Sequence, residues 1–457
     1  MAKYSPFFYA YLVAAVGFVE NLDGSVLNTA LPSIARDFAI PAAALSVAVS
    51  SYLIAVMLGT PLAGWISKRV GAKKVLLSAL GLFVGASLGC AFSPSLAVFI
   101  TMRIIQGIAG AMMAPVGRMM VLQNSSSEQR IRLMATLTWP GLLAPILGPV
   151  VGGVICTYWH WSWIFLLNVP IGAVLFGCIW LTFEELPSSS SNFDYLGFSL
   201  ITLGLTPFMV VIELANELSV GMSLLILAIS AVVMAGAIYH LLHSSQPLFH
   251  LHAFRHRSFR VSNRGGMLFR LVISCVPFVL PLMMQLAMGY SAAASGAMLL
   301  WLFVGNLLTK SRTTWLITTF GFRRVLKING LCVALSLVLC AQISLHQPDW
   351  ILAILFFFCG VVRSLQFTTL STLSVIDLPK NEIFDGSTIN SIIRTMSRAL
   401  GIACCGLLLR ILPQTQWVAD NSTGLFSLVF YILAAMALVA WFDVLRLPKS
   451  VSTQSNQ

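Results

Sequence analysis

Apolar runs of about 20 residues recur along nearly the whole chain, separated by short polar segments. Each run is long enough to cross roughly 30 Å of hydrocarbon as a helix, and none alternates with the two-residue period of a barrel strand. The pattern therefore predicts an all-α polytopic membrane protein with about fourteen transmembrane helices. We expect these helices at about 7–30, 43–64, 74–94, 96–122, 133–157, 163–183, 195–215, 219–242, 262–289, 293–318, 323–344, 350–376, 386–412 and 424–446.

Composition agrees with this pattern. Of the 457 residues, 58% are hydrophobic and 9% are charged, whereas about a quarter are charged in an ordinary soluble domain. No soluble domain is expected, so the net charge of +12 reflects membrane topology and does not indicate a nucleic-acid partner. The lipid bilayer is the expected environment, and we expect the protein to be a monomer within it.

The basic residues fall on one side of the predicted membrane. The loops on the opposite side hold only Arg36, with Arg410 close by. By the positive-inside rule the basic side and both termini are cytoplasmic, which predicts a multi-pass protein of the cell inner (plasma) membrane. The residues that carry this bias are Lys68, Arg69, Lys73, Lys74, Arg130, Arg132, Arg255, Arg257, Arg260, Lys310, Arg312, Arg323, Arg324, Lys327, Lys380, Arg446 and Lys449.

Cysteines and histidines do not suggest a metal centre. The nine cysteines lie in or at the edge of the predicted helices without metal-ligand spacing, and we interpret them as packing residues. The histidines can form a metal site or part of a solvated cytoplasmic loop, and the loop is favoured; they are His243, His250, His252 and His256. No nucleotide loop or nucleophile–base arrangement appears, so neither a cofactor nor an enzyme is predicted.

The stretch from Gly141 to Gly153 holds two prolines and four glycines inside an apolar segment. Lipid tolerates this composition because neighbouring helices can re-satisfy the backbone groups that proline frees. Gly141, Pro145, Gly148 and Gly152 share one helical face, and Gly148 with Gly152 forms a GxxxG pair. A second helix can therefore approach this face closely. From spacing alone, a packing seam is the simpler interpretation.

Two short sequence echoes indicate an internal repeat. Gly71-Ala-Lys-Lys-Val-Leu76 opens the third predicted helix, and Gly321-Phe-Arg-Arg-Val-Leu326 opens the eleventh. One helix later, Arg103-Ile-Ile-Gln106 is echoed by Arg363-Ser-Leu-Gln366. The shared order and orientation favour two parallel six-helix halves related by an axis along the membrane normal. We expect the halves at 1–186 and 246–457, with two additional helices at 187–245.

Several motifs resemble those of the major facilitator superfamily, specifically its fourteen-span drug:proton antiporters and most closely the bacterial MdtD-like multidrug transporters. They are Leu22-Asp-Gly-Ser-Val-Leu-Asn-Thr-Ala-Leu-Pro32, Arg103-Ile-Ile-Gln-Gly-Ile-Ala-Gly110 with Pro115, the Gly141 to Gly153 stretch, Trp163 to Gly172, and Pro247 to Phe259. The resemblance implies the major facilitator fold and alternating access. It also implies that Gly141, Pro145, Gly148, Pro149, Gly152 and Gly153 form an antiporter motif.

One loop departs from the family pattern. The resemblance implies a cytoplasmic gating loop formed by Gly64, Lys68, Arg69, Gly71, Lys73 and Lys74. Where the family usually has an acid that helps to latch the two halves, this chain has Lys68, and Ala72 stands in place of the usual arginine. A lysine should weaken or replace the latch.

Acidic residues inside the predicted helices are candidates for proton coupling, because a bare charge at mid-bilayer costs about 2.5–3.5 kcal/mol on insertion scales. Only Glu20, Asp23 and Glu213 lie clearly within the spans. Glu20 and Asp23 are three residues apart on one helical face, and close carboxylates in a low-dielectric setting raise each other's proton affinity. The alternative for Asp23 is a structural hydrogen bond to the backbone of the first or fourth helix.

Six arginines also fall inside the predicted spans: Arg103, Arg118, Arg270, Arg363, Arg394 and Arg398. Arg118, Arg270, Arg394 and Arg398 can snorkel toward helix ends. Arg103 lies toward mid-membrane and is the expected counter-ion of Asp23. We assign Asn28, Gln106, Arg270, Arg363 and Gln366 to a possible substrate cavity.

These features predict a proton-coupled secondary active exporter of small amphipathic molecules, with a multidrug range. The partners expected are a small-molecule substrate and protons. The excess of arginines over acids leaves open an anionic or zwitterionic substrate. A non-transporting sensor with the same fold also stays open, because Lys68 departs from the family pattern. Replacing Gly148 by a bulky residue is expected to abolish exchange while the protein still inserts.

Overall fold

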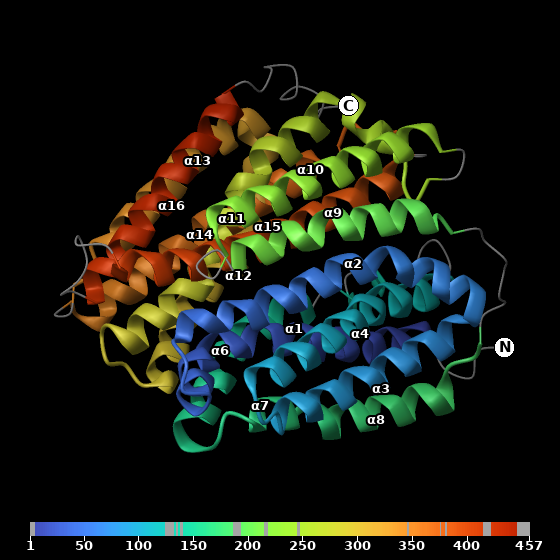
Figure 1. Cartoon of the computed structure of the whole chain (residues 1–457), viewed down its shortest axis with the longest axis horizontal. Coiled ribbons are helices and arrows are strands. Elements are labelled where there is room, and N and C mark those ends of the chain that lie inside the picture. The colour runs from blue at the N-terminus through green and yellow to red at the C-terminus, as the bar shows by residue number, and fades with distance from the viewer. Residues whose placement is uncertain are drawn as a thin grey trace. The chain divides into compact units, whose positions relative to one another are not determined.

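The computed structural model describes residues 5–123, 132–133, 136–137, 140–185, 193–213, 218–244, 247–344, 347–374, 376–379, 382–414 and 422–445. Four of the basic residues named above lie outside these ranges: Arg130, Lys380, Arg446 and Lys449. Part of the beginning of the fifth predicted span also lies outside them, and so does the side chain of Glu213. The regular elements in the described ranges are helices (Figure 1).

Thirteen helices in the described part of the chain are long and apolar enough to cross a membrane, and Leu143–Tyr158 is a shorter apolar helix. This shorter helix corresponds to the fifth of the fourteen predicted spans, which was expected to begin at residue 133. The sixth predicted span begins with a single turn at Trp163–Leu166 and continues from Asn168 to Thr182. The prediction of an all-α polytopic membrane protein is confirmed.

The helices form two compact units. The first unit is Met1–Phe193 together with Ser291–Gly296. Its elements are α1 (Pro6–Asp37), η1 (Ala42–Leu45), α2 (Ser46–Val70), α3 (Ala72–Ala91), α4 (Leu96–Gln123), α6 (Pro140–Tyr158), α7 (Trp163–Leu166) and α8 (Asn168–Thr182). Within it, α4 packs against α2 and α3, α1 packs against α6 and α4, and α8 packs against α3 (Figure 1).

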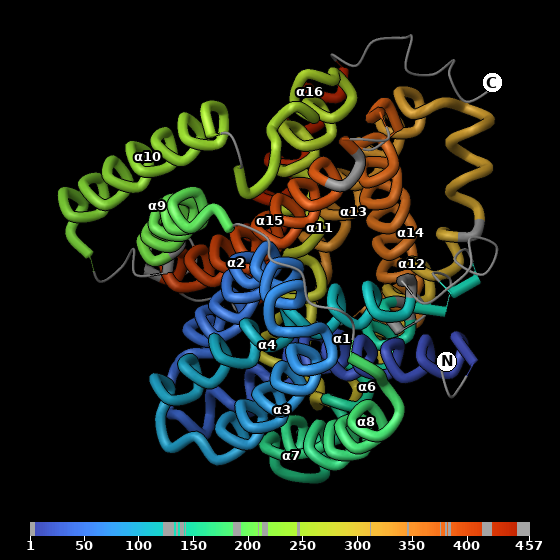
Figure 2. The backbone as a smooth tube through the Cα atoms, turned by 90° about the vertical axis from the view of Figure 1, so that its right-hand side faces the viewer, coloured from blue at the N-terminus to red at the C-terminus, as the bar shows by residue number. Residues whose placement is uncertain are grey.

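The second unit is Asp194–Tyr290 with Ala297–Gln457. Its elements are α9 (Tyr195–Glu213), α10 (Val220–His243), η2 (Leu251–Arg255), α11 (Arg257–Leu286), α12 (Ala292–Phe320) from Ala297 onward, α13 (Phe322–Ala341), α14 (Asp349–Leu373), α15 (Ile383–Ile411), η3 (Leu412–Gln414) and α16 (Ser422–Leu445). Helix α9 lies beside α10 and also contacts α15 (Figure 2). The division into 1–186, 187–245 and 246–457 stays a prediction.

The two glycines that open the sequence echo occupy the same local structure. Gly71 has φ +106° directly before α3, and Gly321 has φ +75° directly before α13. Both angles lie in the left-handed region, which a residue without a Cβ adopts at little cost. Each glycine therefore lets the chain turn sharply from one helix into the next.

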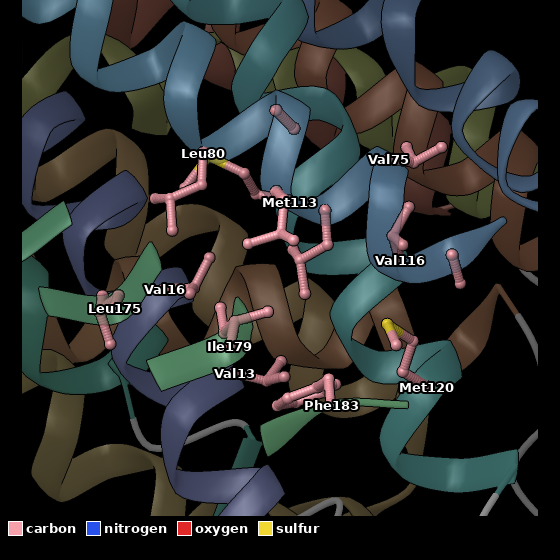
Figure 3. Close-up of a cluster of buried hydrophobic side chains, with 14 of the residues drawn as sticks. Val13, Val16, Val75, Leu80, Met113, Val116, Met120, Leu175, Ile179 and Phe183 are labelled. Atoms are coloured by element: carbon pink, nitrogen blue, oxygen red, sulfur yellow. The ribbon is translucent and has the colours of Figure 1, made fainter. Parts of the chain in front are cut away.

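The apolar core of the first unit is built mainly from α1, α3, α4 and α8, and Ala63 of α2 joins it. Side chains of α1, α3, α4 and α8 interlock there, including Val16, Leu80, Met113 and Ile179 (Figure 3). Lipid tails are as apolar as these side chains, so the contacts stabilise the unit mainly through close van der Waals packing. This packing fixes the positions of the helices that carry the polar residues described below.

The glycine face of α6 packs tightly on α1, but only along part of its length. A Cβ at Gly148 would lie 3.0 Å from Val26 N, and one at Gly152 would lie 2.6 Å from Val26 O. A Cβ at Gly141 would meet nothing within 4 Å. The predicted close approach is therefore present at the GxxxG pair and absent at Gly141. Ser25 Oγ of α1 donates to the Ala144 carbonyl at 3.0 Å, so the two helices are in contact from Ala144 onward but not at Gly141.

The other side of α6 is close to the short segment Ser291–Gly296 of the same unit. A Cβ at Gly153 would lie 3.0 Å from Ala293 Cα, and one at Gly296 would lie 3.4 Å from Val150 Cα. Small residues thus let α6 approach backbone on two sides.

Replacing Gly152 by alanine should lower stability, because the added methyl group overlaps the Val26 carbonyl. Overpacking of this kind costs about 1–3 kcal/mol. We expect Gly152→Ala to lower the thermal unfolding midpoint of the purified protein in detergent. Gly141→Ala is the matched control and should leave the midpoint unchanged; equal midpoints for both variants would contradict the packing described.

Candidate functional site

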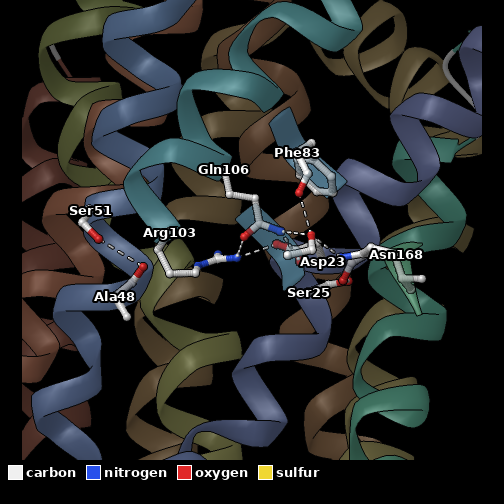
Figure 4. A network of polar contacts seen from close by, with 10 residues as sticks. Asp23, Ser25, Ala48, Ser51, Phe83, Arg103, Gln106 and Asn168 are labelled. Carbon is white, nitrogen blue, oxygen red and sulfur yellow. Dashed lines mark hydrogen bonds and ion pairs between the residues drawn. The ribbon is translucent and has the colours of Figure 1, made fainter. Parts of the chain in front are cut away.

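Asp23 of α1 lies at the centre of a buried polar network (Figure 4). Its side chain is 2% exposed, and the Arg103 side chain from α4 is fully buried. Arg103 Nη1 donates to Asp23 Oδ2 at 2.6 Å, which makes a buried ion pair. The contact predicted between these two residues is confirmed.

Two amides complete the coordination of the Asp23 carboxylate. Gln106 Nε2 and Asn168 Nδ2 each donate to Asp23 Oδ1 at 2.9 Å. Both amides also donate to Ser87 Oγ, at 2.8 and 3.3 Å, and this hydroxyl donates to the Phe83 carbonyl at 2.8 Å. The network thus joins α1, α3, α4 and α8.

Two further contacts hold the Arg103 guanidinium in place. Its Nη1 donates to Gln106 Oε1 at 2.5 Å, so Gln106 contacts both members of the ion pair. The guanidinium carbon lies 4.3 Å from the ring centroid of Tyr52 on α2, close enough for a cation–π contact. The Phe165 ring centroid lies 5.9 Å from the same carbon, so Arg103 is surrounded by one charge, one amide and two aromatic rings.

In this geometry, the charge of Asp23 affects how strongly α1 is held against α4 and α8. Three donors complement the two oxygens of an ionised carboxylate, and the pair is neutral overall. Removing one member of a buried pair leaves an uncompensated charge, which costs about 3–5 kcal/mol. Proton binding at the Asp23 carboxylate would therefore change its attraction to α4 and α8 together.

Glu20 has a different environment from Asp23. Its side chain is partly exposed and lies near Gly110 of α4, where a Cβ would be 3.5 Å from Glu20 Cγ. The hydrogen-bond and ion-pair partners of Asp23 are three donors, and Glu20 is not among them. The structural alternative for Asp23 is wrong in its detail, because these partners are side chains and not backbone groups.

Sequence reasoning missed Asn168, Ser87 and Tyr52. Asn168 stands in the Trp163 to Gly172 motif and is the strongest of the missed signals, since an amide in an apolar span needs a partner. Ser87 and Tyr52 carry no such signal, because single hydroxyl groups are common in membrane helices, where serine can bond to its own backbone.

An acid from elsewhere in the chain contacts the start of α3, and the sequence pattern did not reveal this contact. Glu185 follows α8, and its Oε1 accepts from Lys73 N at 3.0 Å. Lys73 Nζ also donates to the Trp180 carbonyl at 2.8 Å. A carboxylate at a helix N-terminus is favourable, so Glu185 caps α3 within the unit. Lys68, which stands in place of the family acid, and Lys74 are exposed, and Arg69 lies 5.4 Å from the Trp65 ring.

The remaining cavity candidates are distributed over both units. Asn28 is partly buried on α1. Arg270 on α11 is fully buried, and its guanidinium donates to Asn263 Oδ1 at 3.3 Å and Asn390 Oδ1 at 2.8 Å. The expectation that Arg270 snorkels is therefore wrong, because amides of α11 and α15 hold it inside the unit. Arg118 is exposed.

Arg363 and Gln366 lie one turn apart on α14. Arg363 Nε donates to the Ile273 carbonyl of α11 at 3.0 Å. Gln366 is fully buried, and its Oε1 accepts from Asn329 Nδ2 of α13 at 2.8 Å. Their membership of a substrate cavity stays a prediction.

Two histidines of the predicted cytoplasmic loop pair with separate acids. His250 Nδ1 lies 2.8 Å from Asp385 Oδ2, and His256 Nε2 lies 3.0 Å from Glu382 Oε2. Among the described residues, no group of three or more histidine, cysteine or acidic side chains is placed to hold a metal.

The sequence matches the model of the Major Facilitator Superfamily over residues 13–402. The chain belongs to this superfamily. Among its relatives are MdtD multidrug resistance proteins from Pectobacterium carotovorum, 32% identical over 94% of this chain and 93% of the relative, and from Serratia proteamaculans, 33% identical over 97% and 94%. This superfamily member is therefore a multi-pass transport protein and not an enzyme.

Solved transporter structures share the fold of this superfamily member. A D-xylose–proton symporter superposes with a TM-score of 0.71 at 15% identity, covering 98% of this chain and all of that one. The peptide-family transporter PepTSo superposes with a TM-score of 0.70 at 14% identity and covers 99% of both chains. The predicted major facilitator fold is confirmed.

The ion pair can be tested by a double-mutant cycle. We expect Arg103→Gln to destabilise the purified transporter by about 3–5 kcal/mol, because Asp23 loses its counter-charge. The double variant with Asp23→Asn should regain part of this loss, since neither charge is then left unpaired. Thermal unfolding in detergent measures both. Arg118→Gln is the control with an exposed arginine, and strict additivity of the two single variants would contradict a direct pair.

The Glu185 cap predicts a smaller effect. Glu185→Gln should lower stability by about 0.3–1 kcal/mol through loss of a carboxylate at the α3 N-terminus. The neighbouring exposed residue offers a matched control, Glu184→Gln, which should have no effect in the same unfolding assay. If both variants behave alike, Glu185 does not cap α3.

Proposed function

We propose that this protein is a proton-coupled antiporter that exports small amphipathic molecules by alternating access. The observation that carries the proposal is the Asp23–Arg103 pair, a carboxylate and a guanidinium buried together within membrane-spanning helices. Charged residues at such depth are costly and typically mark ion or proton pathways. The names of the MdtD relatives support multidrug export.

The coupling step is protonation of Asp23. A proton that binds the carboxylate removes the charge that attracts Arg103, so the contacts from α4 and α8 to α1 weaken together. Loss of the proton restores the ion pair. The helices thus have two arrangements whose balance depends on proton occupancy, which is what an exchanger needs in order to link proton entry to substrate exit.

Glu20 is the second acid in the proposed pathway. It lies on the same helix as Asp23, one turn earlier, and is partly exposed. Although its Oε2 is buried, the residue as a whole is more exposed than Asp23, so it can exchange protons with solvent more readily. We assign it the role of passing protons toward Asp23.

The antiporter motif controls movement of α6 against α1. Gly148 and Gly152 allow close contact with Val26, which lies one turn after Asp23 on the same helix. A shift of α1 that follows protonation would therefore move α6 as well. We propose that this contact, which is made by glycines without side chains, lets α6 slide along α1 without opening a leak between them.

The proposed orientation places both termini and the basic loops in the cytoplasm, with the protein monomeric in the inner membrane. Exposed Lys68, near the end of α2, and exposed Lys74, near the start of α3, support this orientation. Glu185 compensates for the missing family acid at the α3 terminus, so that loop can retain a structural role in gating.

Asp23→Asn tests the coupling. We expect the wild-type protein in vesicles with an imposed pH gradient to show proton flux that depends on added substrate, and the variant to show none. The substrates tested are ethidium, norfloxacin and 1-naphthalenesulfonate, which cover a cation, a zwitterion and an anion. Exchange of labelled for unlabelled substrate without a gradient should persist in the variant, because this reaction needs no net proton movement.

The control is Asp37→Asn, at the exposed end of the same helix, where the carboxylate contacts His160 and Trp161. It should keep the proton flux. Uphill transport by Asp23→Asn would rule out the assignment, and a wild-type protein without flux for any of the compounds would favour a sensor.

A further inference from the structure

The Arg-x-x-Gln pattern of α4 recurs on α14, but its surroundings differ. In the first unit, Arg103 Nη1 and Gln106 Nε2 both donate to the carboxylate of Asp23. The equivalent donors in the second unit belong to Arg363 and Gln366. There the neighbouring helix α11 offers Arg363 only the backbone carbonyl of Ile273.

The two donors that bind Asp23 in the first unit are unsatisfied in the second. Gln366 uses its Oε1 to accept from Asn329, while its buried Nε2 has no hydrogen-bond partner. Arg363 uses its Nε, while its Nη1 is buried without a partner. Buried donors without partners are rare in native proteins, and these two belong to residues one turn apart on α14.

Arg270 adds a second uncompensated charge on α11, one turn before Ile273. Its partners are the amide oxygens of Asn263 and Asn390, and its Nε has none. Among the described residues, no carboxylate lies within 4 Å of Arg270 or Arg363. Neutral acceptors cannot cancel the charge of a buried guanidinium, so this region favours an anion.

Two aromatic rings and a third arginine lie near Arg363 or its neighbours on α14. The Arg363 guanidinium is 5.9 Å from the Phe303 ring on α12. Arg394 on α15 is 5.9 Å from the ring of Phe367, one turn after Arg363 on α14. The surroundings therefore combine positive charge with apolar faces, which matches a ligand that has both an acidic group and a ring.

We propose that Arg363 and Gln366, supported by Arg270, bind the carboxylate of an amphipathic organic anion as the transported substrate. A guanidinium presents paired donors in the plane that a carboxylate accepts, and the free Gln366 amide adds a third donor. The substrate then supplies in the second unit the group that Asp23 supplies in the first. This inference rests on the proposed export function and specifies the charge of its substrate.

The test is binding of three small probes to the purified full-length protein in detergent. Benzoate, benzamide and benzamidine share a ring and a size, and at neutral pH they are an anion, a neutral molecule and a cation. We expect benzoate to bind more tightly than the other two. Arg363→Gln should weaken benzoate binding by about tenfold or more, because truncating one member of a buried charged contact is costly. Calorimetry measures the Kd directly.

A second variant separates ligand binding from folding. Gln366→Glu places a carboxylate one turn from Arg363, where it can neutralise the guanidinium as Asp23 neutralises Arg103. We expect this variant to lose benzoate binding while its unfolding midpoint stays equal or rises. Arg118→Gln, an exposed arginine in the first unit, is the control and should bind benzoate like the wild type.

Tighter binding of benzamidine than benzoate, no benzoate binding by the wild type, or unchanged benzoate binding by Arg363→Gln would each overturn the proposal. The assay uses no pH gradient, so it is independent of proton coupling. A protein that binds benzoate but shows no Asp23-dependent flux would overturn only the antiport mechanism. Flux without benzoate binding would overturn only the anion site.

Discussion

The ion pair between Asp23 and Arg103 is the constraint on which the first unit depends. Two opposite charges in the membrane interior are tolerated only in close contact and with their remaining hydrogen-bonding groups satisfied. Gln106, Asn168 and Ser87 meet that requirement from three helices, and Tyr52 covers the guanidinium from a fourth. The apolar core of the unit holds these helices at the separation that the network needs. Packing and electrostatics thus fix the same arrangement.

The Arg-x-x-Gln pattern occurs in both units, but its electrostatic surroundings differ. On α4 the arginine and glutamine meet an internal carboxylate, and the result is a neutral, closed network. On α14 the same residue types meet a carbonyl and an amide, and the charge is left over. In the proposed mechanism, the first unit binds the proton and the second unit binds the anionic substrate. Such a division also explains why arginines outnumber acids inside the spans.

Glycines matter at two kinds of position in this structure. Gly71 and Gly321 provide left-handed backbone before α3 and α13, where a side chain would be strained. Gly148 and Gly152 instead remove side-chain volume so that α6 can touch the backbone of α1. Because α1 carries Asp23, this close contact is the route by which, in the proposed mechanism, a displacement of the ion pair reaches α6. The acid that caps α3, Glu185, follows α8 in the chain, so the α3 N-terminus is anchored to the segment after α8.

The sequence by itself determined the membrane class, the positions of most helices and the internal repeat. Long apolar runs can satisfy their backbone groups in lipid only as helices, so these features need no knowledge of tertiary contacts. The Asp23–Arg103 pair was predicted as well, because both charges lie deep in the membrane and the family resemblance implies that the first and fourth helices face each other. Only the tertiary structure decided which neutral groups complete the network, since single serines and tyrosines are indistinguishable in sequence from ordinary packing residues. It also decided that Gly141 is open while Gly148 is not, and that Arg270 is enclosed by amides instead of reaching the interface. Each of these outcomes depends on the distance between helices, which the periodicity of a single helix does not contain.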